Sequence, residues 1–347
     1  MTTKHEAWLA LTLEDPMNPD LPICDPHHHL WDFTRNHVPD YAIQVPRYLL
    51  EELLEDIGGG HNIVRTVFLE CQAMYRKAGS REMQPIGETE FVQGIAAQSA
   101  SGQYGTTNVA AGIVGFADLT LGAKVAPVLE AHMAASRNRF RGIRYISTWD
   151  ANSDIIHSES HKGVLLDPKF REGFAYLNKY ELSFDAGIYH TQLMELVDLA
   201  RAFPDTPIIV NHTSIPIGIG PYAGKREEVL REWKHGIAAL GSYHNVFMKL
   251  GGLGMAICGF GWHERTIPPS SAELAEAMAP YYLWCIEQFG ADRCMFESNF
   301  PVDKMSYSYT VLWNAFKRIS EDFSPEKRSA LFHDTAVRAY RLAASHK

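Results

Sequence analysis

Short apolar runs alternate along the chain with longer stretches whose apolar residues recur at helical spacing. Each run gives way to polar residues at its end, which is typical of a strand buried on both faces. Parallel strands of this kind need crossover helices between them. The alternation therefore predicts an α/β fold, a single (β/α)₈ barrel of the TIM type, with strands at residues 23–29, 62–73, 109–119, 140–148, 182–190, 207–214, 245–254 and 293–303.

The helical stretches follow the strands one by one, and the fourth opens with Asp167 and Pro168, which suit a helix N-cap and first turn. A doubly wound open sheet is the alternative, but its first strand should lead into a glycine-rich phosphate turn, and no glycine follows this one. The predicted helices cover residues 48–60, 88–101, 124–136, 167–180, 191–204, 225–243, 271–290 and 310–320, with a last amphipathic segment at 325–343.

Two segments lie outside this repeated pattern. An N-terminal extension precedes the first strand, and a long loop, residues 255–270, follows the seventh. Loops of this length on a compact scaffold commonly form lids or pocket walls. Because the chain shows neither a linker nor a short internal repeat, we expect one domain over residues 1–347.

Composition narrows the classes of partner. Hydrophobic residues make up 46% and charged residues 21%, as in ordinary globular proteins. The net charge of −9, without a long Lys/Arg cluster, argues against a nucleic-acid partner. The five cysteines form no C-x-x-C pair, so we expect reduced thiols. Neither a signal peptide nor a membrane-length apolar stretch is evident, which favours the cytoplasm and no membrane partner.

Polar residues gather where the predicted strands end. In a (β/α)₈ barrel the active site lies at the carboxyl ends of the strands, so these side chains should converge. They are His27, His29, Glu70, Gln72, Asp118, Arg144, Tyr189, His190, His212, Lys249, Asn299 and Asp303.

The histidines carry the sharpest prediction. Strand alternation places His27 and His29 on one face, where they can share a metal ion or a substrate atom, and His28 on the other. A surface tract or tag remnant is the alternative, but apolar residues flank this segment on both sides. His212 interrupts an apolar strand abruptly, which also favours a chemical role, whereas His190 could instead point into the following helix.

The remaining strand-end residues have structural alternatives. Glu70 could cap a neighbouring loop, Arg144 could pair with a carboxylate, and Lys249 could extend toward solvent.

Several motifs in order resemble the amidohydrolase superfamily, specifically its amidohydrolase-2 branch, which includes sugar lactonases and the pyrone dicarboxylate lactonase. In that branch an activated water, with or without a divalent metal, attacks a lactone or amide carbonyl. The motifs are D-x-H-x-H-L-W (25–31), R-G-I-R (141–144), N-H-T-S (211–214), K-L-G-G (249–252), S-N-F-P (298–301) and L-F-H-D-T-A-x-R-x-Y-R-L (331–342).

The resemblance implies roles for individual residues. His27 and His29 match a pair that binds a metal, expected to be zinc, or a carbonyl group. His212 matches a catalytic histidine that orients substrate or metal. The substrate-binding positions implied are Gln72, Arg144, Tyr189, His190 and Lys249.

One position departs from the family pattern. The eighth strand usually ends S-D-x-P, but here Asn299 replaces the acid. An amide is a poorer metal ligand than a carboxylate and cannot act as a general base. We therefore expect another carboxylate, Asp303, Glu297 or Glu70, to substitute, and place Asn299 and Asp303 with His212 in the catalytic set. A metal-free site stays open for the same reason.

The sequence thus predicts a hydrolase of a small cyclic ester, a lactone, acting by water attack at the barrel mouth. A non-oxidative decarboxylase of an aromatic or unsaturated acid, and a barrel that binds a ligand without turnover, are the alternatives. The expected partners are a small-molecule substrate and, from the habit of such barrels to associate, further copies of the chain.

Overall fold

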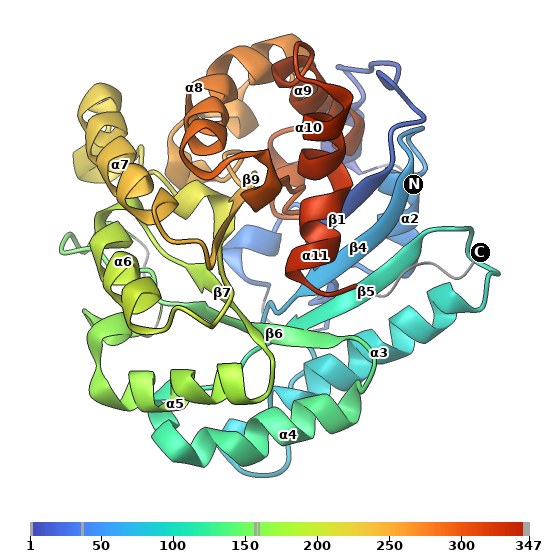
Figure 1. Cartoon of the computed structure of the whole chain (residues 1–347). Coiled ribbons are helices and arrows are strands. Elements are labelled where there is room, and N and C mark those ends of the chain that lie inside the picture. The colour runs from blue at the N-terminus through green and yellow to red at the C-terminus, as the bar shows by residue number, and fades with distance from the viewer. Residues whose placement is uncertain (1–2, 36–37, 156–157, 159, 343–347) are drawn as a thin grey trace.

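Eight parallel strands form the centre of the molecule, in a computed structural model that describes residues 3–35, 38–155, 158 and 160–342. Their order in the sheet follows the chain, and the helices surround them (Figure 1), which confirms the predicted α/β barrel. The strands are β1 (Ile23–His28), β4 (Ile63–Leu69), β5 (Asn108–Gly115), β6 (Phe140–Ile146), β7 (Ser183–Gly187), β8 (Ile208–Val210), β9 (Val246–Leu250) and β10 (Cys294–Phe296).

The barrel closes between its first and last strands. The backbone N–H of Asn299 donates to the His27 carbonyl at 2.9 Å, and that of His29 donates to the Phe300 carbonyl at 2.8 Å. This seam places the residues that follow β10 directly beside the first-strand histidines. A separate antiparallel pair, β2 (Trp31–Asp32) and β3 (Arg47–Tyr48), follows β1.

Apart from the short helix Lys4–Leu9 in the N-terminal extension, the helices lie where amphipathic spacing predicts them. Asp167 caps its helix by accepting from the N–H groups of Lys169 and Phe170, as the sequence suggests. The helices are α1 (Lys4–Leu9), α2 (Leu50–Ile57), α3 (Ile86–Ala100), α4 (Ala126–Ala135), α5 (Pro168–Lys179), α6 (Leu193–Ala202), α7 (Arg226–Gly241), α8 (Ser271–Phe289), α9 (Tyr309–Ile319), α10 (Pro325–Ser329) and α11 (Thr335–Ala339).

All eight barrel strands are shorter than the ranges predicted from the sequence, and two of them, β8 and β10, have only three residues. β8 ends at Val210 because the next residues turn into left-handed backbone, and β10 ends at Phe296. In both cases the polar end of the run leaves the strand ladder and lies at the mouth of the barrel.

The barrel interior has its own apolar core. It contains strand residues such as Val67, Val114 and Ile209, together with Ala336 of α11 and Tyr340, which directly follows α11. Figure 1 shows α11 in front of the strands, and it contacts β1 and β10. The larger core lies between the sheet and the outer helices.

The N-terminal extension and the long loop pack against each other. Trp8 Nε1 donates to the Arg265 carbonyl at 2.9 Å, and Thr12 Oγ1 donates to the Pro268 carbonyl at 2.9 Å. Within the loop the rings of Phe260 and Trp262 stack at 4.3 Å. Of the two roles considered for this loop, these contacts favour a pocket wall.

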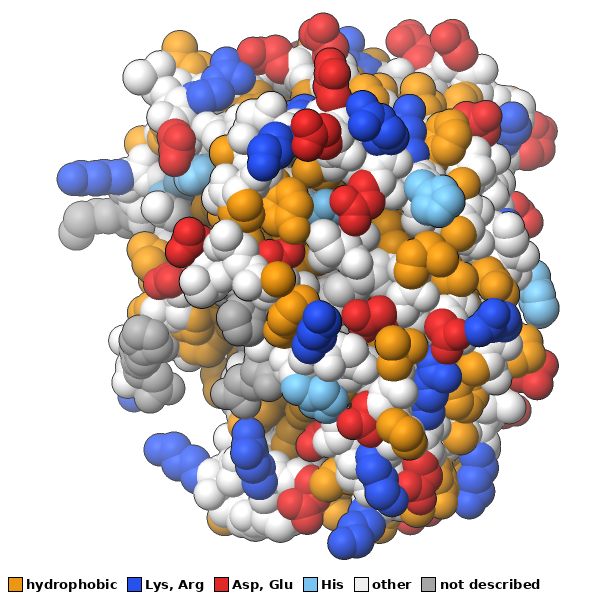
Figure 2. All heavy atoms as spheres, turned by 90° about the vertical axis from the view of Figure 1, so that its left-hand side faces the viewer, with side chains coloured by type: hydrophobic (Ala, Val, Ile, Leu, Met, Phe, Trp, Pro, Cys, Tyr) orange, Lys and Arg blue, Asp and Glu red, His pale blue; other side chains and the backbone are white. Residues whose placement is uncertain are grey.

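Charge on the molecular surface is mixed. On the face drawn in Figure 2, acidic and basic side chains are interspersed. Among the helices that the structure describes, none is both long and apolar enough to cross a bilayer. The single domain, the cytoplasmic location, the absence of a nucleic-acid partner and self-association stay predictions.

Candidate active site

The first-strand histidines alternate as predicted. The rings of His27 and His29 lie 4.9 Å apart on one side of β1. His28 points the other way, with Nε2 2.8 Å from the Thr66 hydroxyl. Trp31 stacks on His29, with the ring centroids 5.9 Å apart, and so forms a wall beside the histidines.

Glu297, the first residue after β10, lies between two imidazoles. Its Oε2 is 2.7 Å from Nδ1 of His27, and its Oε1 is 2.7 Å from Nδ1 of His212. Oε1 also accepts the backbone N–H of His212 at 3.1 Å. All three side chains are buried. Of the three carboxylates that could replace the missing acid, Glu297 alone has these two contacts among the described residues.

A strained turn presents His212. Residues His212, Thr213, Ser214 and Ile215 all have positive φ, between 38° and 59°. Such backbone is costly for residues with side chains and persists only where surrounding contacts impose it. One of these contacts is a hydrogen bond of 2.6 Å from Trp233 Nε1 to the Thr213 carbonyl.

Asn299 and Asp303 form a second chain of contacts, which ends at His29. Asn299 Oδ1 lies 3.3 Å from His29 Nε2, and its Nδ2 donates to Asp303 at 2.8 Å. Asp303 also accepts from the Tyr307 hydroxyl and the Gly254 N–H. Burial raises the pKa of Asp303 to about 6. Asp303 therefore orients Asn299, and its catalytic role stays a prediction.

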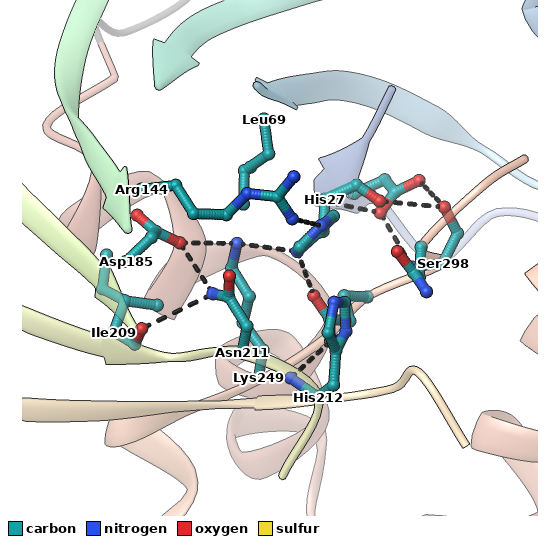
Figure 3. A network of polar contacts seen from close by, with 12 residues as sticks. His27, Leu69, Arg144, Asp185, Ile209, Asn211, His212, Lys249 and Ser298 are labelled. Carbon is teal, nitrogen blue, oxygen red and sulfur yellow. Dashed lines mark hydrogen bonds and ion pairs between the residues drawn. The ribbon is translucent and has the colours of Figure 1, made fainter. Parts of the chain in front are cut away.

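The two predicted cations reach His27 from different strands. The Arg144 guanidinium lies 3.5 Å from His27 Nε2, and Lys249 Nζ lies 3.2 Å from His27 Nδ1 (Figure 3). Each is already paired with a buried carboxylate, Arg144 with Glu70 at 3.0 Å and Lys249 with Asp185 at 2.9 Å. Arg144 is thus paired with a carboxylate, which was its structural alternative, and it also lies next to His27.

Other predicted residues lie further along the strand ends. Asp118 accepts from Thr120 and caps a turn. His190 is buried against the Tyr222 ring, with Nδ1 accepting from a backbone N–H. Gln72 is exposed, with a positive φ of 62°. The substrate-binding roles of Gln72, His190 and the neighbouring Tyr189 stay predictions.

Sequence reasoning missed Asp185. It lies in the middle of β7, is fully buried, and accepts a hydrogen bond from Lys249 Nζ. A carboxylate inside an apolar strand was the available signal, because an ionised group is rarely buried without a partner. For Glu297 the signal was strand alternation, since residues 297 and 299 can face the same side.

The cluster of His27, His212 and Glu297 suits a divalent metal. Ligand atoms of His27, His212 and Glu297 all lie within 4.8 Å of one another. Burial, and then the charge of Lys249, hold the pKa of His27 well below its usual range, so the ring is neutral, as a ligand must be. Glu297 Oε2 faces His27 Nδ1 at 2.7 Å, so the carboxylate and the imidazole can reach the same ion. Two histidines and one glutamate are a ligand set used by catalytic zinc, with a fourth position for water.

Comparisons with known proteins agree with this architecture. A family model described as amidohydrolase matches residues 24–342. The chain is 35% identical to the uncharacterized protein y4mH of Sinorhizobium fredii, over 93% of this chain and 99% of that protein. It is 27% identical to an L-fucono-1,5-lactonase of Burkholderia ambifaria, over 78% of this chain and 87% of the lactonase.

A solved structure shares the fold. The crystal structure of an amidohydrolase from Burkholderia multivorans with bound zinc superposes with a TM-score of 0.70 at 22% identity, covering 92% of this chain and 99% of that one. This likeness shows a shared fold, and the family model, which covers most of the chain, establishes the family. The chain is an enzyme of the amidohydrolase family.

Proposed function

We propose that this enzyme hydrolyses a neutral, hydroxylated lactone, with a divalent metal such as zinc held by His27, His212 and Glu297. The observation that carries the proposal is the position of Glu297, whose two oxygens each face a different imidazole at 2.7 Å. The zinc-bound structural relative and the sugar lactonase relative support the metal and the substrate class.

The two oxygens of Glu297 have different surroundings, which suits them to different tasks. Oε1 accepts two hydrogen bonds from His212 and so fixes that ring. Oε2 is buried and faces His27 Nδ1 at 2.7 Å, and as a carboxylate oxygen at this centre it can accept the proton of the attacking water. A metal bound at this centre would polarise the lactone carbonyl and lower the pKa of water.

Arg144 is placed to stabilise the negative charge that develops on the carbonyl oxygen. Its guanidinium lies beside His27 and is buried, so its field is weakly screened. Glu70 accepts from Arg144 through both its carboxylate and its carbonyl oxygen, which holds the guanidinium in one orientation.

The pairing of the cations favours a neutral substrate. Within the described residues of the site, Arg144 and Lys249 each contact a buried carboxylate of their own. A substrate with two carboxylates would find these charges already compensated, and Glu297 would repel it. A ring with hydroxyl groups can instead use the polar atoms of the site as hydrogen-bond partners.

A panel of lactones tests the proposal. We expect turnover of five- and six-membered sugar lactones, measured by acid release, and much weaker turnover of a pyrone dicarboxylate. His27→Ala should abolish activity, while His235→Ala, an exposed position on α7, should leave it unchanged.

Two results would overturn this function. One is a folded, zinc-supplemented protein that leaves every lactone intact. The other is release of carbon dioxide from aromatic acids in place of lactone hydrolysis, which would establish a decarboxylase.

A further inference from the structure

A buried chain of polar contacts joins the closed end of the barrel to the active site. The Tyr340 hydroxyl donates to Asp185 Oδ1 at 2.7 Å. The same oxygen accepts from Lys249 Nζ and from Asn211 Nδ2, both at 2.9 Å. Lys249 Nζ in turn lies 3.2 Å from His27 Nδ1. Figure 3 shows Asp185 joined to both Asn211 and Lys249, with His27 beyond them.

Tyr340 contacts both members of the ion pair. Besides its hydrogen bond to Asp185, its ring lies 5.3 Å from Lys249 Nζ, within the range of a cation–π interaction. Tyr340, Asp185 and Lys249 are all fully buried. Electrostatic interactions are strong in such surroundings, and the position of each group depends on its remaining partners.

The Asp185 carboxylate depends on these donors for its orientation. Its three described hydrogen bonds all reach Oδ1, whereas Oδ2 has none within the described residues. Loss of the Tyr340 hydroxyl would leave two donors on one side of the carboxylate. The carboxylate could then rotate about its Cβ–Cγ bond and carry the Lys249 ammonium with it.

We propose that Tyr340 is a positioning residue for the active site, which fixes Asp185 and thereby holds Lys249 against His27. The inference rests on the proposed function only in that His27 belongs to the reacting centre. It gives the closing sequence motif, which contains Tyr340, a role in the active site, although Tyr340 itself directly follows α11.

The test uses two conservative variants. Tyr340→Phe removes the hydroxyl and keeps the ring. Tyr282→Phe is the matched control, because Tyr282 is equally buried and its hydroxyl has no described hydrogen bond. We expect Tyr340→Phe to lower kcat about three- to tenfold with KM unchanged, and Tyr282→Phe to lower neither.

A double mutant with Asp185 distinguishes a positioning role of Tyr340 from a general effect on stability. In an Asp185→Asn background, Tyr340→Phe should have no further effect on kcat, because its route to Lys249 is already broken. A merely structural tyrosine would instead give effects that multiply.

A second readout does not depend on activity. In protein labelled with nitrogen-15 histidine, the His27 ring resonances, assigned with His27→Gln, should shift in Tyr340→Phe and stay in place in Tyr282→Phe. Absence of lactone turnover in the wild type would refute the proposed function and leave this experiment intact. Unmoved His27 resonances, or equal kcat for the two tyrosine variants, would refute the positioning role.

Discussion

At the scale of single residues, the acid of this site occupies a different position from the one that the family resemblance implies. The residue expected to be acidic, Asn299, contacts His29, while the carboxylate that faces His27 and His212 is Glu297. The sequence identified Glu297 as one of three substitutes for the missing acid. It could not choose among them, because the choice depends on side-chain directions across the barrel seam.

Glu297→Gln tests this assignment. The amide keeps an oxygen that can accept from His212 but replaces the other oxygen with a group that cannot accept a proton. We expect kcat to fall about 100- to 10,000-fold, the usual cost of losing a general base. Steady-state kinetics with a sugar lactone measure the loss. Near-normal turnover would exclude Glu297 as the base, and Glu70→Gln, which alters the Arg144 pair instead, serves for comparison.

Glu88 makes folding stability depend on pH. Burial, and then the charge of Glu70, raise the pKa of Glu88 from an ordinary value of 4.5 to about 8. The folded state therefore favours the neutral acid. The stability that this preference contributes is complete below about pH 4.5 and is lost as the pH rises through 8.

Replacing Glu88 with Gln should remove this dependence. The wild type should lose free energy of unfolding relative to Glu88→Gln as the pH rises between about 5 and 8, by at most about 1.4 kcal/mol per pH unit. Urea unfolding at several pH values measures both curves. If the two curves run parallel over this range, the raised pKa is refuted.

At the scale of elements, the strands that present the site are well predicted and the turns after them are not. Period-two alternation was enough to assign the faces of His27, His28 and His29. The left-handed turn at His212 has no local signal, since it contains no glycine and is imposed by distant contacts such as that of Trp233. The glycine that makes room for His212 lies after β9, in a different part of the sequence.

This glycine is Gly252. Its φ is +73°, and a Cβ atom there would lie 2.5 Å from the His212 side chain. We expect Gly252→Ala to displace His212 and to lower kcat/KM at least about tenfold, with a loss of roughly 1–3 kcal/mol of stability. Kinetics together with thermal unfolding measure both effects.

Gly94 provides the control for Gly252. It lies within α3, and a Cβ atom there would have no neighbour within 4 Å. Gly94→Ala should keep full activity and gain up to about 1 kcal/mol of stability, because alanine favours the helix. Equal behaviour of the two alanine variants would contradict the role assigned to Gly252.

At the scale of the whole molecule, counting strand–helix units was sufficient to predict the sheet order that the structure shows. The ion pairs that join the barrel strands could not be predicted in this way. Arg144 with Glu70 and Lys249 with Asp185 join strands far apart in the chain, and only the three-dimensional arrangement identifies the partners. The same limit applies to Tyr340. Its sequence motif was recognised, but its contact with Asp185 was not predicted.

Metal binding should stabilise the whole fold. The ligands come from β1 and from the segments after β8 and β10, so they converge only in the folded chain. At zinc concentrations near one hundred times Kd, we expect a gain of about 2.7 kcal/mol and a rise in Tm of roughly 4 °C over chelator-treated protein. Differential scanning calorimetry measures the shift, and His27→Ala should eliminate it.

The placement of α11 beneath the strands has a consequence for how the protein is made in the cell. The helix follows every strand in the chain, yet Tyr340 fills the interior that those strands enclose. A nascent chain still attached to the ribosome just after β10 would possess all eight strands and lack the residue that seals them. We therefore expect the barrel to reach its native fold only after this helix has been translated. A stop codon upstream of Tyr340 should yield an unfolded chain that is degraded, and not a folded enzyme with reduced activity.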